Sequence, residues 1–472
     1  CAGCATNPVT GKQDIVLMSE KDEIAMGEQV NAQVMQGERI YNDVELQNYV
    51  QYVGNKLAQK SHRPGLNYRF TVLDSKDVNA FALPGGYIYV TRGLLAYLNS
   101  EAELAAVLGH EIGHVTARHA VRQHSATQLT SIGAAIGSAF IPGVGQAGYQ
   151  LAGVLGEAML KGYGREHELE ADRLGAEYLA RTGYDPDAMI AVIGALKSQE
   201  LLEFRLARDE GREPRVYHGL FASHPDNDTR LQEVVANASK VTPVQNPFLG
   251  RNDYMQRVNG LVYGEDTSQG IVKDRDFYHG GLGFAMRFPP AWQIHNLSDR
   301  LIAVSPGQDA YLQVTLVRVD PKSSPAEVFS KNMKIERLGS EQALKIHGLP
   351  AHTGTTPVNT GVGQRLARIT VIQMGGRAFV VQGVTKSPAG FGRYDAAFVD
   401  TAQTFRPLTR EERQLASKDQ RVRVFQANEQ TTFENLAKTS PLEKFPEEQI
   451  RLINGAYPRG EIRPGEVMKT VQ

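Results

Sequence analysis

The chain has little cysteine and no surplus of either charge. Its 472 residues include two cysteines, Cys1 and Cys4. Two cysteines so close together cannot close a useful loop, and they cannot supply a cysteine-rich zinc site. Lys and Arg number 51 against 52 Asp and Glu, which argues against a protein that binds nucleic acid through a basic surface. Any metal must therefore be held by His, Asp or Glu.

The N-terminal residues have an unusual pattern. The chain begins with Cys1 rather than Met, and polar, turn-rich residues follow as far as Gly11. This start resembles a bacterial lipoprotein after removal of its signal peptide. We expect residues 1–18 to be a linker with a lipid on Cys1, or on Cys4 if the first residue is an arbitrary boundary. A lipid anchors a protein to a membrane without a spanning segment.

Composition and length favour several folded domains. The chain is 41% hydrophobic and 22% charged, values that suit packed cores rather than disorder, and its length suffices for roughly two to four domains. The composition shifts near residues 267–270. We therefore expect a multidomain α+β protein with a mainly helical domain and small sheet at 19–265, an α+β sandwich-like domain at 270–408, and a small unit at 420–472.

Local patterns in the first domain predict specific elements. Apolar residues recur at helical spacing between 19 and 60, which predicts two amphipathic helices. Ser100 with Glu103 forms a capping box that opens a third helix. A further helix is expected from Arg165 to a stop at Gly183. Strands are expected around 68–72 and at 87–90, the latter after a Pro-Gly-Gly turn.

The segment Ser125–Gly156 contains no charged residue. A long apolar run would predict a membrane span, but proline, several glycines and polar residues interrupt this one. We interpret it as a helical hairpin that covers a neighbouring site. Contact with a membrane surface and a true span are the alternatives.

The sequence His110-Glu111-Ile112-Gly113-His114 fits the pattern His-Glu-x-x-His. Residues four apart lie on one face of a helix, so both imidazoles can reach one ion while Glu111 sits beside them. Because the motif falls inside the helix that Ser100 opens, its structural context supports a metal site.

A catalytic zinc needs three protein ligands and an open position. On the helix that begins near Arg165, Glu168 and Asp172 share a face. Glu168 can serve as third ligand, and Asp172 can accept a hydrogen bond from the free ring N–H of a zinc-bound histidine. The alternative for this stretch is a solvated acidic face.

These motifs together resemble the zinc endopeptidases that include the CAAX prenyl, HtpX-type and BepA-like proteases. The resemblance extends to residues 79–86, to 165–172, and to Ser223-His224-Pro225 with Arg230-Leu231, and covers about residues 19–265. It implies a zincin-like fold with one zinc ion per subunit. It also implies that His110, His114 and Glu168 are the ligands, Glu111 the catalytic base and Asp172 the orienting group.

Two further elements are candidates for the site. His224 could donate to the developing oxyanion or bind zinc as a fourth ligand, with a helix-cap role as the alternative. Tyr87, Ile88 and Tyr89 are predicted to present an open strand edge to which an extended substrate adds, with an ordinary half-buried strand as the alternative. His119 and His124 are interpreted as surface residues.

The C-terminal parts of the sequence contain no residues at the spacing of a catalytic motif. Residues 281–292 resemble the opening strand and turn of PsbP-like domains, and three segments within 422–472 resemble a LysM-like unit, a glycan-binding fold. We interpret the first as a partner-binding or positioning module. The resemblances imply contact with peptidoglycan or envelope proteins, with a purely structural role as the alternative for the LysM-like unit.

The sequence as a whole predicts a lipid-anchored zinc endopeptidase. We expect it on the periplasmic face of a bacterial membrane, with the outer membrane favoured over the inner one. Its expected role is protein quality control, in which it cuts misfolded or unassembled envelope proteins. Nucleic acid is not expected as a partner. The alternatives are an envelope-binding protein with a vestigial protease domain and a chaperone-like assembly factor with a latent one.

Overall fold

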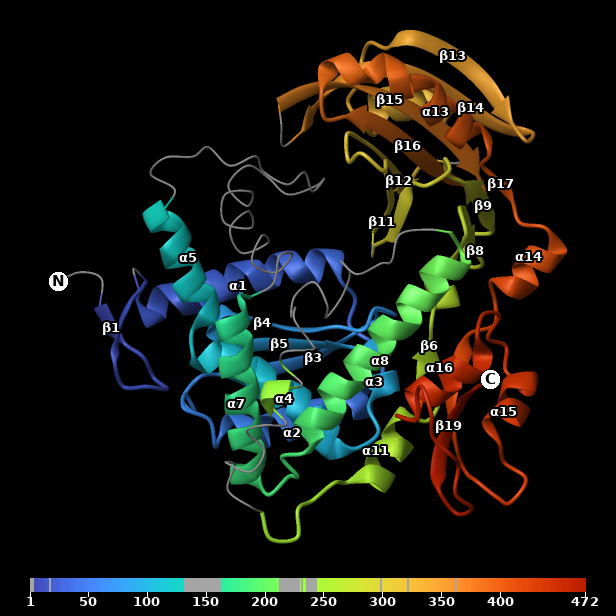
Figure 1. Ribbon diagram of the computed structural model, residues 1–472. Coiled ribbons are helices and arrows are strands. Elements are labelled where there is room, and N and C mark those ends of the chain that lie inside the picture. The colour runs from blue at the N-terminus through green and yellow to red at the C-terminus, as the bar shows by residue number, and fades with distance from the viewer. Residues whose placement is uncertain are drawn as a thin grey trace. The chain divides into compact units, whose positions relative to one another are not determined.

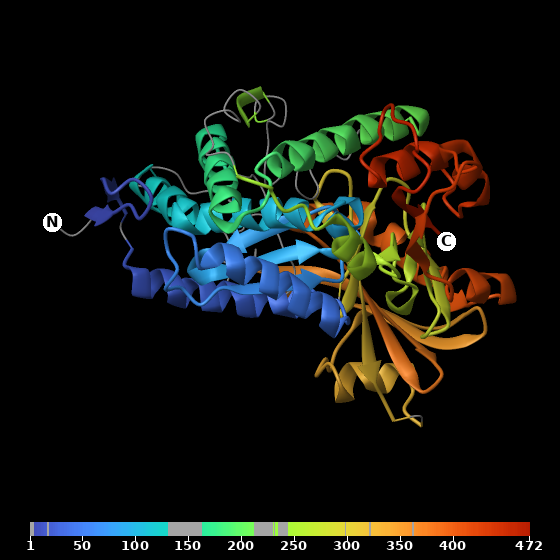
Figure 2. The ribbon, with the colours of Figure 1, turned by 90° about the horizontal axis from the view of Figure 1, so that it is seen from below.

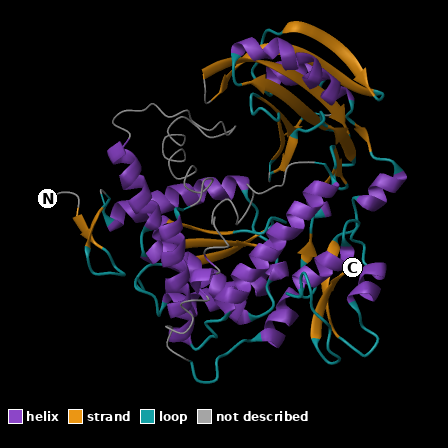
Figure 3. Cartoon of the chain, viewed as in Figure 1, coloured by secondary structure: helices purple, strands orange, loops and turns teal. Residues whose placement is uncertain are grey.

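The computed structural model describes residues 4–16, 18–130, 163–211, 230, 232–234, 244–297, 299–320, 322–360 and 363–472. These residues form two compact units (Figure 1). Unit 1 comprises the described residues up to Gly264 together with Gln420–Gln472, and unit 2 comprises Glu265–Asp419. Helices and several sheets occur in the same chain (Figure 3), which confirms the expected multidomain α+β class.

Unit 1 is mainly helical. The α-helices described in its part before residue 265 are α1 (Glu20–Gly37), α2 (Val44–Ala58), α3 (Arg92–Tyr97), α4 (Glu101–Thr116), α5 (His119–Thr130), α7 (Arg165–Thr182), α8 (Ala188–Asp209) and α11 (Arg251–Val258). The two helices expected between 19 and 60 are α1 and α2. In α2, Asp43 caps the first turn, and apolar residues at helical spacing, among them Val50 and Val53, are fully buried.

A small three-stranded sheet lies in the core of unit 1. Its strands β3 (Arg69–Leu73), β5 (Tyr87–Thr91) and β4 (Ala80–Leu83) are hydrogen-bonded in that order. β5 is parallel to β3 and antiparallel to β4, to which the Pro84–Gly86 turn connects it. Figure 2 shows the sheet among the helices of unit 1, and its buried residues share one core with those of α2 and α4.

The position of β5 corrects one prediction. Tyr87, Ile88 and Tyr89 were expected to offer an open edge to a substrate. Both edges of β5 are instead occupied by neighbouring strands, and all five of its residues are buried. An added peptide strand cannot pair with a strand whose backbone groups already bond on both sides, so the predicted binding role of these three residues is wrong.

Residues 420–472 share a sheet and a core with the rest of unit 1. β18 (Gln420–Gln426) pairs with β19 (Val467–Val471) on one side and with β6 (Val262–Tyr263) on the other. Helices α15 (Phe433–Thr439) and α16 (Pro446–Ile453) lie between β18 and β19 in the chain. The fully buried Lys469 donates from Nζ to the carbonyl oxygens of Ala96 and Leu98, each at 2.7 Å. The segment therefore packs just before the start of α4, and its likeness to LysM stays a prediction.

Unit 2 is built on two antiparallel sheets. A seven-stranded sheet has the order β10-β11-β12-β16-β15-β14-β13, and a four-stranded sheet has the order β17-β9-β8-β7. The strands are β7 (Ile271–Lys273), β8 (Asp276–His279), β9 (Phe284–Arg287), β10 (Gln293–Asn296), β11 (Arg300–Val304), β12 (Ala310–Arg318), β13 (Gly339–Ile346), β14 (Leu349–Thr360), β15 (Gly363–Met374), β16 (Arg377–Thr385) and β17 (Arg406–Pro407). Its helices are α12 (Pro325–Lys331), α13 (Phe391–Gln403) and α14 (Arg410–Leu415).

Two helices of unit 2 cover opposite faces of the larger sheet. On β16, Phe379 belongs to the core that contains Phe398 of α13, and its neighbour Val380 belongs to the core that contains Phe329 of α12. Successive strand residues point to opposite faces, so α12 and α13 lie on different sides. Ser324 opens α12 with a capping box.

A short hairpin, β1 (Cys4–Thr6) with β2 (Gln13–Ile15), precedes α1. None of the helices among the described residues combines the length and apolar character that crossing a membrane requires. The hairpin predicted for Ser125–Gly156 falls, from residue 131 onward, outside the described residues.

Candidate metal centre

The site depends on where α4 begins. The Ser100 hydroxyl accepts a hydrogen bond from the Glu103 N–H at 3.1 Å, and the Glu103 carboxylate accepts one from the Asn99 N–H at 2.8 Å. The expected cap is therefore present, with its return bond one residue earlier than in a standard capping box. Within the helix that starts here, His110 and His114 are four residues and so about one turn apart, and both are buried.

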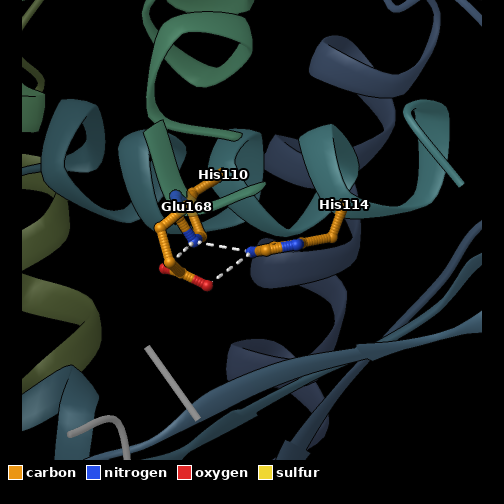
Figure 4. Close-up of side chains that lie close together, drawn as sticks. All are labelled: His110, His114 and Glu168. Atoms are coloured by element: carbon orange, nitrogen blue, oxygen red, sulfur yellow. Dashed lines mark hydrogen bonds and ion pairs between the residues drawn. The ribbon is translucent and has the colours of Figure 1, made fainter. Parts of the chain in front are cut away.

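Three donor atoms converge between α4 and α7 (Figure 4). The Nε2 atoms of His110 and His114 lie 3.0 Å apart. Each lies 3.5 Å from a different carboxylate oxygen of Glu168. Glu168 is fully buried, so its carboxylate requires a positive partner there. The structure thus brings together the three residues that the sequence nominated as ligands.

The donor atoms of these three residues are spaced closely enough to share one tetrahedral metal ion. Ligands about 2.0–2.1 Å from a central ion lie about 3.3 Å from one another in a tetrahedron. The observed separations of 3.0, 3.5 and 3.5 Å bracket that length. Two imidazole nitrogens and one carboxylate oxygen form a donor set that suits zinc and related transition metals better than calcium or magnesium.

Asp172 fixes the ring of His110. Its Oδ1 lies 2.7 Å from His110 Nδ1, and both carboxylate oxygens accept from Arg230, at 2.7 and 2.8 Å. Burial works to raise the pKa of Asp172, but Arg230 and His110 outweigh it and hold the pKa at about 2. An ionised Asp172 can only accept, so His110 Nδ1 donates to it, and in the neutral ring that a metal ion requires the lone pair is on Nε2.

Arg230 is a site residue whose role the sequence did not indicate. It is buried, and its Nη1 also lies 3.4 Å from the Glu168 carboxylate. The adjacent acids raise the pKa of its guanidinium against the effect of burial. Arg230 therefore supplies positive charge to two carboxylates of the site. The sequence showed that Arg230 lies in a segment that resembles the protease family. Its two carboxylate partners, however, lie about sixty residues earlier in the chain, and no local spacing points to them.

His119 corrects a second prediction. It was expected on the surface, yet it is fully buried, and its Nδ1 lies 2.8 Å from His114 Nδ1. The reason is a break in the helix: α4 ends at Thr116, Arg118 has φ 54°, and α5 starts at His119. Five residues along a continuous helix would turn His119 away from His114. The side chain of His124 lies outside the described residues.

His119 is in turn bonded to α7. Its Nε2 lies 3.1 Å from Glu170 Oε2, which also accepts from Arg122 at 3.0 Å. The hydrogen bond from His119 lowers the pKa of Glu170 to about 2. Arg122 also lowers it, and burial acts in the opposite direction. The sequence interpretation included Glu170 in the acidic stretch without giving it a role.

Glu111 and Tyr163 are the remaining described residues beside the metal centre that we consider. Glu111 lies between the two histidines on α4 and is 1% exposed. The Tyr163 ring stacks on His114, with ring centres 4.2 Å apart and planes at 20°. Burial raises the pKa of Tyr163, as do the charges of Glu111 and Glu168, so its phenol stays protonated. No pattern in the sequence pointed to Tyr163.

Two predicted residues lie outside the described residues. They are His224, the candidate oxyanion donor, and Cys1, the candidate lipidation site.

Comparisons with known proteins agree with this geometry. The model of Peptidase family M48 matches residues 45–238. A beta-barrel assembly-enhancing protease of Yersinia pestis is 27% identical over 389 residues, covering 73% of this chain and 75% of the relative. The protein of that name in Escherichia coli K12 is 30% identical over 250 residues, covering 51% and 48%. Mitochondrial metalloendopeptidase OMA1 of Arabidopsis thaliana is 35% identical over 130 residues, covering 27% and 26%.

The extent of these matches differs. The chain spans three quarters of the Yersinia relative, about half of the Escherichia relative and about a quarter of the Arabidopsis one. Among solved structures, cyanobacterial PsbP from Synechocystis resembles 31% of this chain at 14% identity, with 98% of its own length covered and a TM-score of 0.24. A TM-score this low supports no conclusion, so the PsbP-like domain at 270–408 stays a prediction.

The family match covers α4 and α7 with their convergent donors, and the relatives are named as proteases and metalloendopeptidases. Residues 45–238 therefore match Peptidase family M48, and the site they carry is that of a metalloendopeptidase.

Proposed function

We propose that this metalloendopeptidase is zinc-dependent and cuts unfolded or unassembled proteins of the bacterial cell envelope. The observation that carries the zinc assignment is the cluster formed by His110, His114 and Glu168. The separations of their donor atoms, 3.0 and 3.5 Å, are close to those expected around a tetrahedral ion, and a buried carboxylate with two imidazoles forms a catalytic-type donor set.

In the proposed mechanism His110, His114 and Glu168 hold the ion and Glu111 moves the protons. A bound zinc ion would polarise the scissile carbonyl and lower the pKa of water at the site. Glu111 takes a proton from the attacking water and delivers it to the amine that leaves. Asp172 keeps the Nδ1 proton on His110, so that the ligand nitrogen stays free of a proton. We retain His224 as the proposed donor to the oxyanion, or as a fourth ligand before substrate binds.

The substrate class and location are proposed from the relatives and the N-terminal residues. Two relatives are named beta-barrel assembly-enhancing proteases, and the membrane β-barrels of bacteria lie in the outer membrane. A lipid on Cys1 would keep the enzyme at the periplasmic face of a membrane, with the outer membrane favoured. Unit 2 and residues 420–472 are proposed to contact peptidoglycan or envelope proteins.

A binding or chaperone-like role without turnover is the second candidate. A domain that no longer cuts peptides would not need the complete set of ligands and orienting partners, yet His110, His114, Glu168 and Asp172 are all present and connected. The complete set favours the enzyme.

Cleavage of unfolded casein by the purified full chain tests the proposal. Wild type is expected to cut casein, to lose this activity with a chelator and to regain it with zinc. Glu111→Gln is expected to bind zinc without cutting. Binding of casein without any cleavage by wild type would favour the second candidate. The lipid is tested separately, by the intact mass of protein extracted from membranes.

A further inference from the structure

The inference concerns the edge of the His114 ring that faces away from Glu168. Four side chains are linked there in sequence: His114 to His119 at 2.8 Å, His119 to Glu170 at 3.1 Å, and Glu170 to Arg122 at 3.0 Å. The link passes from α4 through α5 to α7. His119 is fully buried within it.

The donor and the acceptor in each of these hydrogen bonds can be assigned by starting from Glu170. Glu170 accepts from Arg122 in an ion pair, so it is placed as a carboxylate that only accepts, and His119 Nε2 must donate to it. With Nε2 donating, Nδ1 of a neutral His119 ring is an acceptor, and it lies 2.8 Å from His114 Nδ1. His114 Nδ1 must therefore donate to His119. The lone pair of His114 is left on Nε2, the atom that lies 3.5 Å from Glu168.

We propose that His119 and Glu170 are positioning residues that hold His114 in the tautomer and orientation that a metal ion needs. The proposal rests on the proposed metal role of His114. It gives both ligands a comparable support from α7: Asp172 holds His110 directly, and Glu170 holds His114 through the imidazole of His119.

Ring contacts give His119 a second role that must be separated from the first. Its ring stacks on His167, with centres 4.3 Å apart and planes at 21°. A smaller side chain would lose this packing together with the hydrogen bonds. Phenylalanine keeps a ring of similar size but has no nitrogen, so His119→Phe isolates the hydrogen bonds.

Three substitutions of His119 distinguish its two nitrogens. In His119→Asn the amide oxygen can take the place of Nδ1 and accept from His114. In His119→Gln the amide nitrogen can take the place of Nε2 and donate to Glu170. If the bond to His114 matters, zinc affinity is expected to fall about 10–100-fold in His119→Phe, to recover partly in His119→Asn and to stay low in His119→Gln.

The measurement is the zinc dissociation constant of the full chain, by competition with a chromophoric chelator. The melting temperature of the metal-free variants shows whether they fold. The matched control is His352→Phe in unit 2, since His352 is also buried and bonded to a glutamate, Glu341, at 2.7 Å. This control is expected to bind zinc as wild type does.

The outcomes separate the inference from the proposed function. Zinc affinity in folded His119→Phe equal to that of wild type would overturn the inference while leaving the zinc site in place. Absence of zinc binding in wild type would overturn the proposed function itself. If His119→Phe does not fold, Glu170→Gln takes its place: a several-fold loss of zinc affinity supports the inference, and unchanged affinity overturns it.

Discussion

Gly109 of α4 and Gly175 of α7 lie directly against each other. A Cβ atom on Gly109 would come within 3.3 Å of the Cα of Gly175. One turn further, a Cβ on Gly113 would lie 3.0 Å from the carbonyl oxygen of Ala171. Small residues four apart on each helix thus allow the two backbones to approach closely. This approach brings the histidines of α4 and the acids of α7 to one centre.

Replacing Gly175 is expected to disturb the metal centre. A Cβ there would lie 3.0 Å from the backbone nitrogen of His110 and 2.6 Å from Met189 Cε. The methionine can move, but the backbone of α4 must shift. We expect Gly175→Ala to lower the free energy of unfolding by about 1–3 kcal/mol and to weaken zinc binding, as measured by urea denaturation and chelator competition.

Gly194→Ala is the matched control on α8. Nothing lies within 4 Å of the added Cβ there, so the substitution is expected to stabilise the helix by about 0.5–1 kcal/mol. Gly175→Ala with wild-type stability and zinc affinity would show that the close approach is not required.

Asp172 is expected to have two separable effects, one on the stability of the fold through Arg230 and one on metal affinity through His110. Asp172→Asn keeps the shape of the side chain but leaves Arg230 buried with less compensation, so we expect a loss of about 3 kcal/mol in the free energy of unfolding. Zinc affinity is expected to fall about 10–100-fold, since His110 loses its charged acceptor.

The double variant Asp172→Asn, Arg230→Gln tests this separation. Removing the buried charge is expected to restore part of the stability, while zinc affinity stays low. Full recovery of zinc affinity in the double variant would show that Asp172 does not act on the metal site through His110.

Because Lys469 is buried, we expect it to make the free energy of unfolding depend on pH. Burial lowers its pKa to about 7, with Glu103 opposing and Arg251 adding to the shift. In the unfolded chain a lysine stays protonated up to about pH 10.4. Between these values the unfolded state binds more protons, so the Lys469 contribution to the free energy of unfolding increases as pH rises.

The test compares wild type with Lys469→Met by urea denaturation between pH 7 and 9. The difference in the free energy of unfolding is expected to move in favour of wild type as pH increases. Lys60→Met, at an exposed lysine, serves as the control. A difference that stays constant or moves the other way would contradict the assignment.

The parts of the site that sequence could predict depend on local periodicity. The start of α4 at Ser100 and the end of α7 at Gly183, which has φ 80°, follow from residues next to those ends. The spacing of His110 and His114 on a helix likewise required no knowledge of the tertiary fold. These features are set within one or two helical turns, and the structure has all of them.

The errors arose at features that the spacing of residue types does not encode. The turn between β4 and β5 is visible in the sequence, but the parallel pairing of β3 with β5 is not, and this pairing closes the second edge of β5. His119 was misplaced because one residue with positive φ, Arg118, turns the chain back toward His114. Arginine rarely adopts this conformation, so the pattern of residues gave no warning.

The most direct test of the central claim measures zinc content and casein cleavage in the same preparations of wild type, Glu111→Gln and His114→Ala. We predict one zinc ion per chain in wild type and in Glu111→Gln, with cleavage by wild type alone. His114→Ala is expected to lose both zinc and cleavage. Cleavage by Glu111→Gln at the wild-type rate, or by wild type stripped of metal, would contradict the assignment of a zinc peptidase centre.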